Sequence, residues 1–148
     1  MYYFAYGSNM AARIMKQWCS RFVVLGPARL DDYRLAFTRP SQRWGGGAAD
    51  VLPARGDSVW GVLYEIDTAV QIVLDEKEGL GIAYQHLDCI AWWEGEHQYP
   101  ALTYTVIDKA DPELHPSPAY KQTLLEGALE NGLPADYLAF LLKIEMAD

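Results

Sequence analysis

Near its start, the sequence reads Tyr2-Tyr3-Phe4-Ala5-Tyr6-Gly7-Ser8-Asn9. Residues 2–6 form a short segment rich in aromatic side chains, which predicts a buried strand. Gly7 and the two polar residues after it break that strand. Residues 10–18 then predict a short helix, with Ser8 or Asn9 as its N-cap. The stretch therefore indicates a strand that turns directly into a helix.

Strand-like segments dominate the region that follows. We expect them at residues 22–25, 33–38, 49–52 and 59–66. The run Gly45-Gly46-Gly47 permits a positive φ or a close backbone approach. Arg55-Gly56-Asp57 is typical of a turn between two strands.

Helices become more frequent later in the chain. Asp67 can cap a helix that runs to Glu78, with Gly79 as its stop. Residues 84–93 and 98–107 predict a hairpin. Pro112, Pro116 and Pro118 mark an extended connection. Ser117-Pro118 then predicts the start of a helix, and Asn131-Gly132 predicts its end. A last helix is predicted from Pro134, with apolar residues at helical spacing: Leu138, Leu141, Leu142 and Ile144. The total is six or seven strands and three or four helices, an α+β chain.

Composition limits the possible partners. The 148 residues are 51% hydrophobic, which fits one domain over residues 1–148. A net charge of −8 argues against a nucleic-acid partner, because phosphate binding needs a basic face. Residues 1–6 show no basic n-region, and no apolar stretch approaches the ~20 residues that span a bilayer. We therefore expect a cytoplasmic protein with no membrane partner, and the sequence carries no signal of its oligomeric state.

The sequence contains no motif for a nucleotide-binding or metal-binding site. The phosphate-binding motifs G-x-x-x-x-G-K-[ST] and G-x-G-x-x-G do not occur. His86, His97 and His115 are scattered, and neither cysteine adjoins one, so structural or surface histidines are favoured over a metal site. Cys19 and Cys89 match no redox spacing and are expected to be free thiols. We expect no metal and no cofactor.

The turn at residues 7–9 has two interpretations. Ser8 sits at a strand-to-helix turn, as a nucleophile does, but the G-x-S-x-G elbow fails because Tyr6 and Met10 occupy the glycine positions. Backbone N–H groups at a helix N-terminus can bind an anion or a developing oxyanion, and Gly7 lets a ligand approach. An ordinary tight turn with a cap explains the same residues equally well.

A second candidate is the acidic end of the predicted helix before Gly79. Asp75, Glu76 and Glu78 crowd its last turn, where the helix dipole disfavours acids. A solvated acidic face is the plain interpretation. Helix-end potential and neighbouring carboxylates would also raise a carboxyl pKa, as a general base near neutral pH requires. Glu78, next to Gly79 and a loop, is best placed to face a pocket.

Five segments recur together in one family. They are Tyr3-Phe4-Ala5-Tyr6-Gly7-Ser8-Asn9; Ser41-Gln42-x-Trp44-x-Gly46-Gly47-x-Ala49; Gly56-Asp57-x-Val59-Trp60-Gly61-Val62; Leu74-Asp75-Glu76-x-Glu78-Gly79; and Pro116-Ser117-Pro118-x-Tyr120 with Glu130-Asn131-Gly132-Leu133-Pro134. In this order, over residues 2–137, the chain resembles the γ-glutamylcyclotransferase family. The resemblance implies a closed mixed β-barrel with surrounding α-helices; the residue pattern alone does not indicate closure.

The resemblance also implies roles for individual residues. Glu78 would be the catalytic acid/base. The residues implied to bind the γ-glutamyl substrate are Tyr3, Phe4, Ala5, Tyr6, Gly7, Ser8, Asn9, Tyr84 and Tyr120. Without the resemblance, Tyr120 is better explained as a core residue on the first turn of its helix.

The implied reaction closes a γ-glutamyl group into 5-oxoproline when the substrate's α-amine attacks its own γ-carbonyl. Relatives that act on γ-glutamylamines carry a Gly-Thr-Leu loop, and glutathione-specific ones a Gly-Ser-Leu loop. Gly7-Ser8-Asn9-Met10 differs from both and favours γ-glutamyl amino acids. Two alternatives use the same pocket: an amidase or hydrolase with water as attacker, and a non-catalytic γ-glutamyl-binding module.

Overall fold

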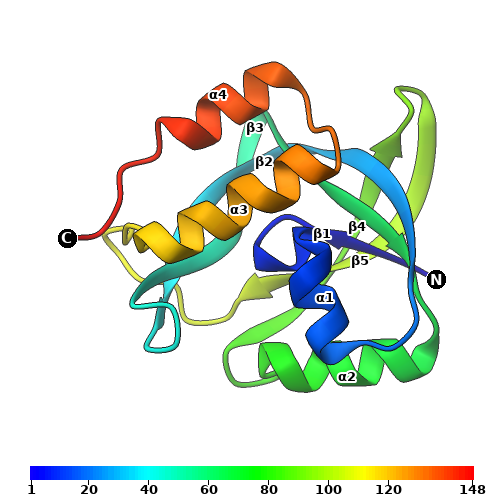
Figure 1. The fold of residues 1–148 in the computed structure, drawn as a ribbon, viewed down its shortest axis with the longest axis horizontal. Helices are drawn as coiled ribbons and strands as arrows, with labels where there is room; N and C mark the ends of the chain where they lie inside the picture. Colours follow the sequence, from blue (N-terminus) through cyan, green and yellow to red (C-terminus); the bar gives the residue numbers. More distant parts are fainter.

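The computed structural model describes all 148 residues, and a five-stranded barrel lies at their centre. The elements, in chain order, are β1 (Tyr2–Ala5), the 3-10 turn η1 (Ser8–Met10), α1 (Ala12–Trp18), β2 (Val23–Ser41), β3 (Gly46–Glu65), α2 (Thr68–Glu78), β4 (Tyr84–Trp93), β5 (His97–Val106), α3 (Pro118–Glu130) and α4 (Ala135–Leu142). In Figure 1, α3 and α4 lie side by side along one side of the barrel, and α1 lies over α2 on another.

The barrel closes through its first strand. The order around it is β1-β3-β2-β4-β5. β1 pairs antiparallel with β3, with Ala5 opposite Val62, and parallel with β5, with Tyr3 opposite Leu102. All other neighbours are antiparallel. The closed mixed barrel that the resemblance implies is therefore confirmed, and β1 delivers the loop at residues 7–9 directly from the barrel wall.

The four separate strands expected between residues 22 and 66 are wrong in number. They join into two long strands, β2 and β3, which pair along nearly their whole length and bend at three irregularities in register. The turn expected at Arg55-Gly56-Asp57 is also wrong, because these residues lie inside β3. They form an excursion opposite Asp32, whose carboxylate accepts a 3.0 Å hydrogen bond from the Gly56 N–H. The excursion bends the ribbon without ending the strand.

The ends of α2 and α3 are as the sequence predicts. The Asp67 carboxylate accepts from the Val70 N–H, 2.9 Å away, and Gly79 stops α2 in the left-handed conformation with φ of 68°. Ser117 caps α3 through the Tyr120 N–H at 3.2 Å. The hairpin of β4 and β5 is also confirmed.

The expected capping of the first helix by Ser8 or Asn9 is wrong. Both residues belong to η1, and the residue before α1 is Ala11, which has no side-chain cap. The first N–H of α1, that of Ala12, instead donates to the Glu130 carboxylate at the end of α3. An acid at a helix N-terminus also suits the helix dipole. Capping from a distant helix frees the side chains of η1 for other contacts.

The core packs η1 tightly beneath α3. Gly127 permits this approach, since a Cβ there would lie 2.6 Å from the Met10 Cβ. Both cysteines are free thiols, as expected, with Cys19 buried and Cys89 half-buried. None of the helices combines the length and apolarity that crossing a bilayer requires.

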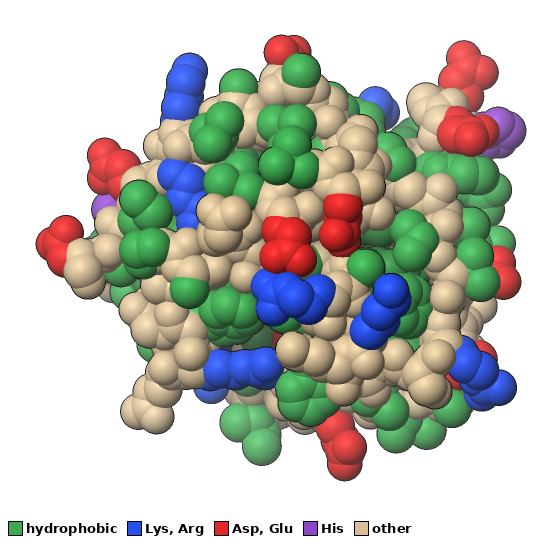
Figure 2. Space-filling model, viewed as in Figure 1, with side chains coloured by type: hydrophobic (Ala, Val, Ile, Leu, Met, Phe, Trp, Pro, Cys, Tyr) green, Lys and Arg blue, Asp and Glu red, His purple; other side chains and the backbone are tan.

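Acidic and basic side chains are dispersed over the face in Figure 2, and neither forms a continuous patch there. Several are directly adjacent, as in the 3.0 Å ion pair between Arg13 of α1 and Glu126 of α3. Such a face lacks the clustered basic groups typical of nucleic-acid binding.

Candidate active site

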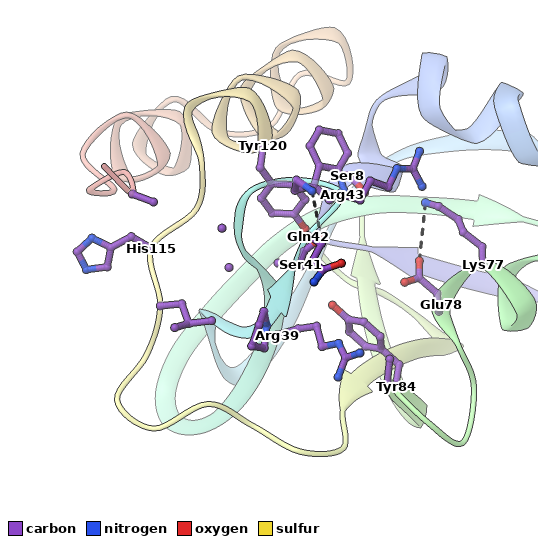
Figure 3. Close-up of a pocket in the computed structure, with 18 residues that line it drawn as sticks. Ser8, Arg39, Ser41, Gln42, Arg43, Lys77, Glu78, Tyr84, His115 and Tyr120 are labelled. Atoms are coloured by element: carbon purple, nitrogen blue, oxygen red, sulfur yellow. Dashed lines mark hydrogen bonds and ion pairs between the residues drawn. The ribbon is translucent and has the colours of Figure 1, made fainter.

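Two adjoining cavities lie where the β1–η1 loop meets the end of α2. The larger is an open cleft of about 950 Å³, which we call the outer cleft. The smaller, of about 40 Å³, is the inner cavity. Both are lined by Ser8, Glu78, Tyr84 and Tyr120, so these four residues mark the boundary between them. Figure 3 shows Glu78 and Tyr84 facing this boundary from one side and Tyr120 from the other.

Glu78 is the last residue of α2, and its side chain is 19% exposed. Because Gly79 reverses the chain in the left-handed region, the helix ends there and the glutamate lies at the cavity boundary. Its Oε1 accepts a 3.0 Å hydrogen bond from Asn9 Nδ2. No other hydrogen bond to this carboxylate is present, so most of its accepting capacity is open to a ligand.

Asn9 joins the N-terminal loop to α2. Its Nδ2 donates both to Glu78 and to the Tyr3 hydroxyl, which is 2.8 Å away. Its Oδ1 accepts from Lys77 Nζ, and its backbone carbonyl accepts a 2.7 Å hydrogen bond from the Tyr64 hydroxyl. The contact with Lys77 fixes which end of the amide faces Glu78. Asn9 therefore orients the carboxylate as well as lining the inner cavity.

Burial raises the pKa of Glu78. The nearby positive charges of Lys77, 3.9 Å away, and Arg43 oppose that rise, as does the hydrogen bond from Asn9. The sequence pattern attributed a raised pKa to the helix end and neighbouring acids. The direction is as expected, but burial is the main cause, and the adjacent charged side chain is a cation.

Lys77 is buried more deeply than Glu78, with a side chain only 7% exposed. Burial lowers the pKa of Lys77, and the adjacent Glu78 carboxylate opposes the change. Its ammonium group also lies 5.9 Å from the centre of the Trp18 ring. The Lys77 ammonium and the Glu78 carboxylate therefore lie close together in a part of the site with little access to water.

Tyrosine hydroxyls line the rest of the boundary. Tyr84 donates to the Ala49 carbonyl at 2.9 Å, and the Tyr120 hydroxyl accepts from the Ala49 N–H at 3.0 Å. Tyr6 donates to the Tyr104 carbonyl. Burial raises the pKa of Tyr6, Tyr84 and Tyr120, so each is neutral near pH 7 and keeps its proton for a hydrogen bond.

The loop presents backbone donors to the same place. Gly7, Ser8 and Asn9 all line the inner cavity. The backbone and side chain of Ser8 lie against the Tyr120 hydroxyl. A Cβ on Gly7 would lie 3.0 Å from that hydroxyl, so a larger residue would crowd the cavity. These donors can bind a carboxylate or a developing oxyanion.

The structure brings together most of the residues implied to bind substrate. The inner cavity is lined by Tyr3, Tyr6, Gly7, Ser8, Asn9, Tyr84 and Tyr120, together with Glu78. Phe4 and Ala5 line neither cavity, and their side chains are buried in the core. They serve the barrel wall instead: the Phe4 carbonyl accepts a 2.7 Å hydrogen bond from the Thr103 hydroxyl.

Sequence reasoning missed several lining residues. Lys77 lies inside a segment that the sequence singled out, yet its position next to Glu78 drew no prediction. Arg39 and Arg43 of the outer cleft, and Tyr104 of the inner cavity, were missed as well. A lysine beside a glutamate at a helix end was the one available signal, because the other residues meet the site only through the fold.

Ser8 and the histidines form no nucleophile pair in this site. His86 lies 2.7 Å from Asp75 Oδ1, and His97 is on the β4–β5 hairpin. His115 lines the far part of the outer cleft (Figure 3). Across the chain, no three side chains from His, Cys, Asp and Glu come together as a possible metal-ligand set.

Comparison with known proteins places this barrel in a class. A model of the AIG2-like family matches residues 58–141. The gamma-glutamylcyclotransferases of Bos taurus and Homo sapiens are 32% and 34% identical to the chain, and each match covers 99% of the chain and 79% of the relative. A solved structure of a gamma-glutamyl cyclotransferase superposes with a TM-score of 0.95 at 31% identity, over 100% of the chain and 89% of its own length.

The fold and the matched segment define an AIG2-like protein. At these identities and coverages, the chain belongs to the γ-glutamylcyclotransferase family. The resemblance seen in the sequence motifs, and the fold that it implied, are confirmed.

Proposed function

We propose that the protein converts γ-glutamyl amino acids to 5-oxoproline and the free amino acid, with Glu78 as general acid/base. The observation that carries this proposal is the position of the Glu78 carboxylate. It is mostly buried, accepts one hydrogen bond, and lines the same cavity as Gly7, Ser8 and Asn9. The names of the family relatives support the same reaction.

The reaction needs an oriented substrate and one proton acceptor. The α-amine of a free γ-glutamyl group is largely protonated at neutral pH, since its pKa is about 8. Glu78 accepts that proton, and its raised pKa makes it a suitable base. Holding the amine against the γ-carbonyl in a reactive geometry can supply ~7–11 kcal/mol.

The bond changes balance without water. The α-nitrogen forms a bond to the γ-carbon, and the carbonyl oxygen takes up negative charge beside the loop at Gly7 and Ser8 and the Tyr120 hydroxyl, whose own proton is not used toward Ala49. The amide C–N bond then breaks as Glu78 returns the first proton to the departing nitrogen. The ring nitrogen gives its remaining extra proton to the regenerated Glu78 carboxylate, from which the released amine takes it up, so the products are a neutral lactam and an ammonium group. Acid/base transfer of this kind contributes about 10²–10⁴-fold.

The test separates ring closure from hydrolysis by blocking the attacking atom. With γ-glutamyl-alanine, we expect 5-oxoproline and alanine. With the same compound acetylated on its α-amine, we expect no cleavage, because the acetylated nitrogen is not nucleophilic. Competition by the acetylated compound against γ-glutamyl-alanine must be measured too, so that exclusion by size is separated from lost nucleophilicity.

Three results would remove the proposal. Glutamate as the initial product, or cleavage of the acetylated compound, would indicate a hydrolase. Tight binding of γ-glutamyl-alanine without any product would indicate a binding module.

A further inference from the structure

The outer cleft holds basic side chains that lack acidic partners. Four of the seven arginines form ion pairs with carboxylates elsewhere on the molecule: Arg13, Arg21, Arg29 and Arg34. Arg39, Arg43 and Arg55 form none. Arg39 and Arg43 both line the outer cleft, whereas Arg55 lies on the bent part of β3 away from it. In a chain of net charge −8, two unpaired guanidinium groups in one cleft are unexpected.

The two guanidinium groups flank Glu78. Figure 3 shows Arg39 next to Tyr84 on one side, and Arg43 near Ser8 and Lys77 on the other. Arg39 is close enough to affect the pKa of Tyr84, and Arg43 that of Glu78. Trp18 and Trp44 contact the Arg43 guanidinium at 5.5 and 5.8 Å from their ring centres, which restrains this otherwise exposed side chain.

Glu78 is the only carboxylate of the cleft lining. The other charged residues there are Arg39, Arg43 and Lys77, and the lining also includes His115. His115 has an acidic neighbour of its own, Glu145 at 3.9 Å. The cleft therefore presents an excess of positive charge to whatever enters it.

If the γ-glutamyl group lies against Glu78 and the loop at the boundary between the two cavities, as the proposed function requires, its leaving group must extend into the outer cleft. The inner cavity has a volume of only about 40 Å³, and the four boundary residues are the only lining that the two spaces share. The outer cleft, at about 950 Å³, has ample room for an amino acid with a long side chain.

Resting on that proposed function, we propose that Arg39 and Arg43 form a leaving-group subsite that prefers a dicarboxylic amino acid, such as the glutamate or aspartate released from a γ-glutamyl dipeptide. A guanidinium group offers a fixed fork of donors that matches a carboxylate. Two separate guanidinium groups can bind two carboxylates, the α-carboxylate and the side-chain carboxylate of the leaving amino acid. A neutral side chain would leave one guanidinium unpaired.

The experiment compares leaving groups of nearly equal shape. γ-Glutamyl-glutamate and γ-glutamyl-glutamine differ by one charge, and the kcat/KM for 5-oxoproline release is measured for both. We expect γ-glutamyl-glutamate to be favoured about tenfold, the value of one charge-assisted hydrogen bond. The preference should decrease at high salt, because the cleft is open to solvent.

Variants then assign the preference to its residues. Arg39→Gln and Arg43→Gln should each lower the glutamate-to-glutamine ratio, mainly through KM for γ-glutamyl-glutamate. Arg55→Gln, which removes an unpaired arginine outside the cleft, should leave the ratio unchanged. A ratio near one in the wild type, or a ratio that survives both cleft substitutions, would overturn the inference.

Failure of the proposed function would look different. If no γ-glutamyl compound yields 5-oxoproline, calorimetric binding of γ-glutamyl-glutamate and γ-glutamyl-glutamine still tests the subsite. Tighter binding of the glutamate compound that is lost in Arg39→Gln or Arg43→Gln supports it, and equal binding of the two compounds rejects it.

Discussion

Two buried carboxylates, Asp50 and Glu78, differ in how many hydrogen-bond donors reach them. The Asp50 side chain is fully buried, and that of Glu78 is 19% exposed. Five donors reach Asp50: the hydroxyls of Thr38 and Thr105, the N–H groups of Val51 and Val106, and the ammonium group of Lys109, at 2.7 to 3.0 Å. Glu78 has one hydrogen-bond donor, Asn9.

The number of donors separates a structural carboxylate from a reactive one. Asp50 ties β2, β3 and β5 to the loop that carries Lys109, and its lone pairs are occupied. Glu78 keeps free lone pairs at a cavity boundary. Burying a carboxylate with so few hydrogen bonds lowers the stability of the fold, but it leaves the carboxylate able to bind a ligand. The contrast predicts that substitution of Asp50 damages the fold and substitution of Glu78 damages only turnover.

Glu78→Gln tests the contrast with the largest expected effect. The change is nearly isosteric and keeps an acceptor for Asn9, but it removes the base. We expect kcat to fall by about 10²–10⁴-fold with the fold intact. Glu76→Gln, an exposed position on the same helix, is the matched control and should have a small effect. Retention of more than about a tenth of the wild-type rate in Glu78→Gln would reject Glu78 as the base.

Asp50→Asn should do the reverse. An amide cannot accept from all five donors, and it leaves the Lys109 ammonium without its carboxylate partner. We expect a loss of about 3 kcal/mol in the free energy of unfolding, measured by urea denaturation. Asp57→Asn, at an exposed carboxylate on the bend of β3, is the control. A stable Asp50→Asn variant with no activity would mean that Asp50 belongs to the active site.

Local signals account for the parts of the fold that the sequence predicts well. The cap at Asp67, the stop at Gly79 and the hairpin of β4 and β5 each depend on residues close together in the chain. Continuity of β2 and β3 was missed because bends and the excursion at Gly56 look like turns in a sequence. Whether a bend ends a strand depends on pairing with a partner strand, which local pattern does not contain.

The site was predicted only in part for the same reason. Glu78 and the loop around Ser8 carry local signals, namely an acid at a helix end and a strand-to-helix turn. The donors that distinguish Asp50 come from segments up to 59 residues away, as with Lys109. Arg39 reaches the outer cleft only because β2 continues beyond the barrel wall.

Lys77→Gln tests how the cation next to Glu78 affects the pKa of that carboxylate. Lys77 holds the pKa of Glu78 down against burial, while the glutamine keeps a donor for Asn9. Since the active form is the carboxylate, the acidic limb of the kcat/KM profile should move to higher pH. Lys16→Gln, outside the outer cleft and inner cavity, should leave the limb in place. A limb that stays or moves to lower pH would contradict the role of Lys77.

Ser8→Ala tests how much the loop contributes beyond its backbone. Because Ser8 is not a helix cap, its removal should cost little stability. The hydroxyl lies at Tyr120 on the cavity boundary, so we expect a loss of about 1 kcal/mol in kcat/KM, or about fivefold. Mass spectrometry should find no acyl group on the wild-type Ser8 during turnover. A trapped acyl-enzyme would instead support a serine hydrolase.

The smallest expected effect concerns stability against pH. Burial raises the folded-state pKa of Glu78 above its unfolded value near 4.5, so the folded state holds the proton more tightly. Below the unfolded pKa both states are protonated, and wild type and Glu78→Gln should have equal Tm. As pH rises through the folded pKa, the wild type ionises at a cost, so Glu78→Gln should become the more stable protein. The gap should be small, because Lys77 and Asn9 offset part of the cost. A gap of the opposite sign that widens with pH would show that the ionised Glu78 stabilises the fold, as the Asp50 carboxylate does, and the contrast between the two carboxylates would fail.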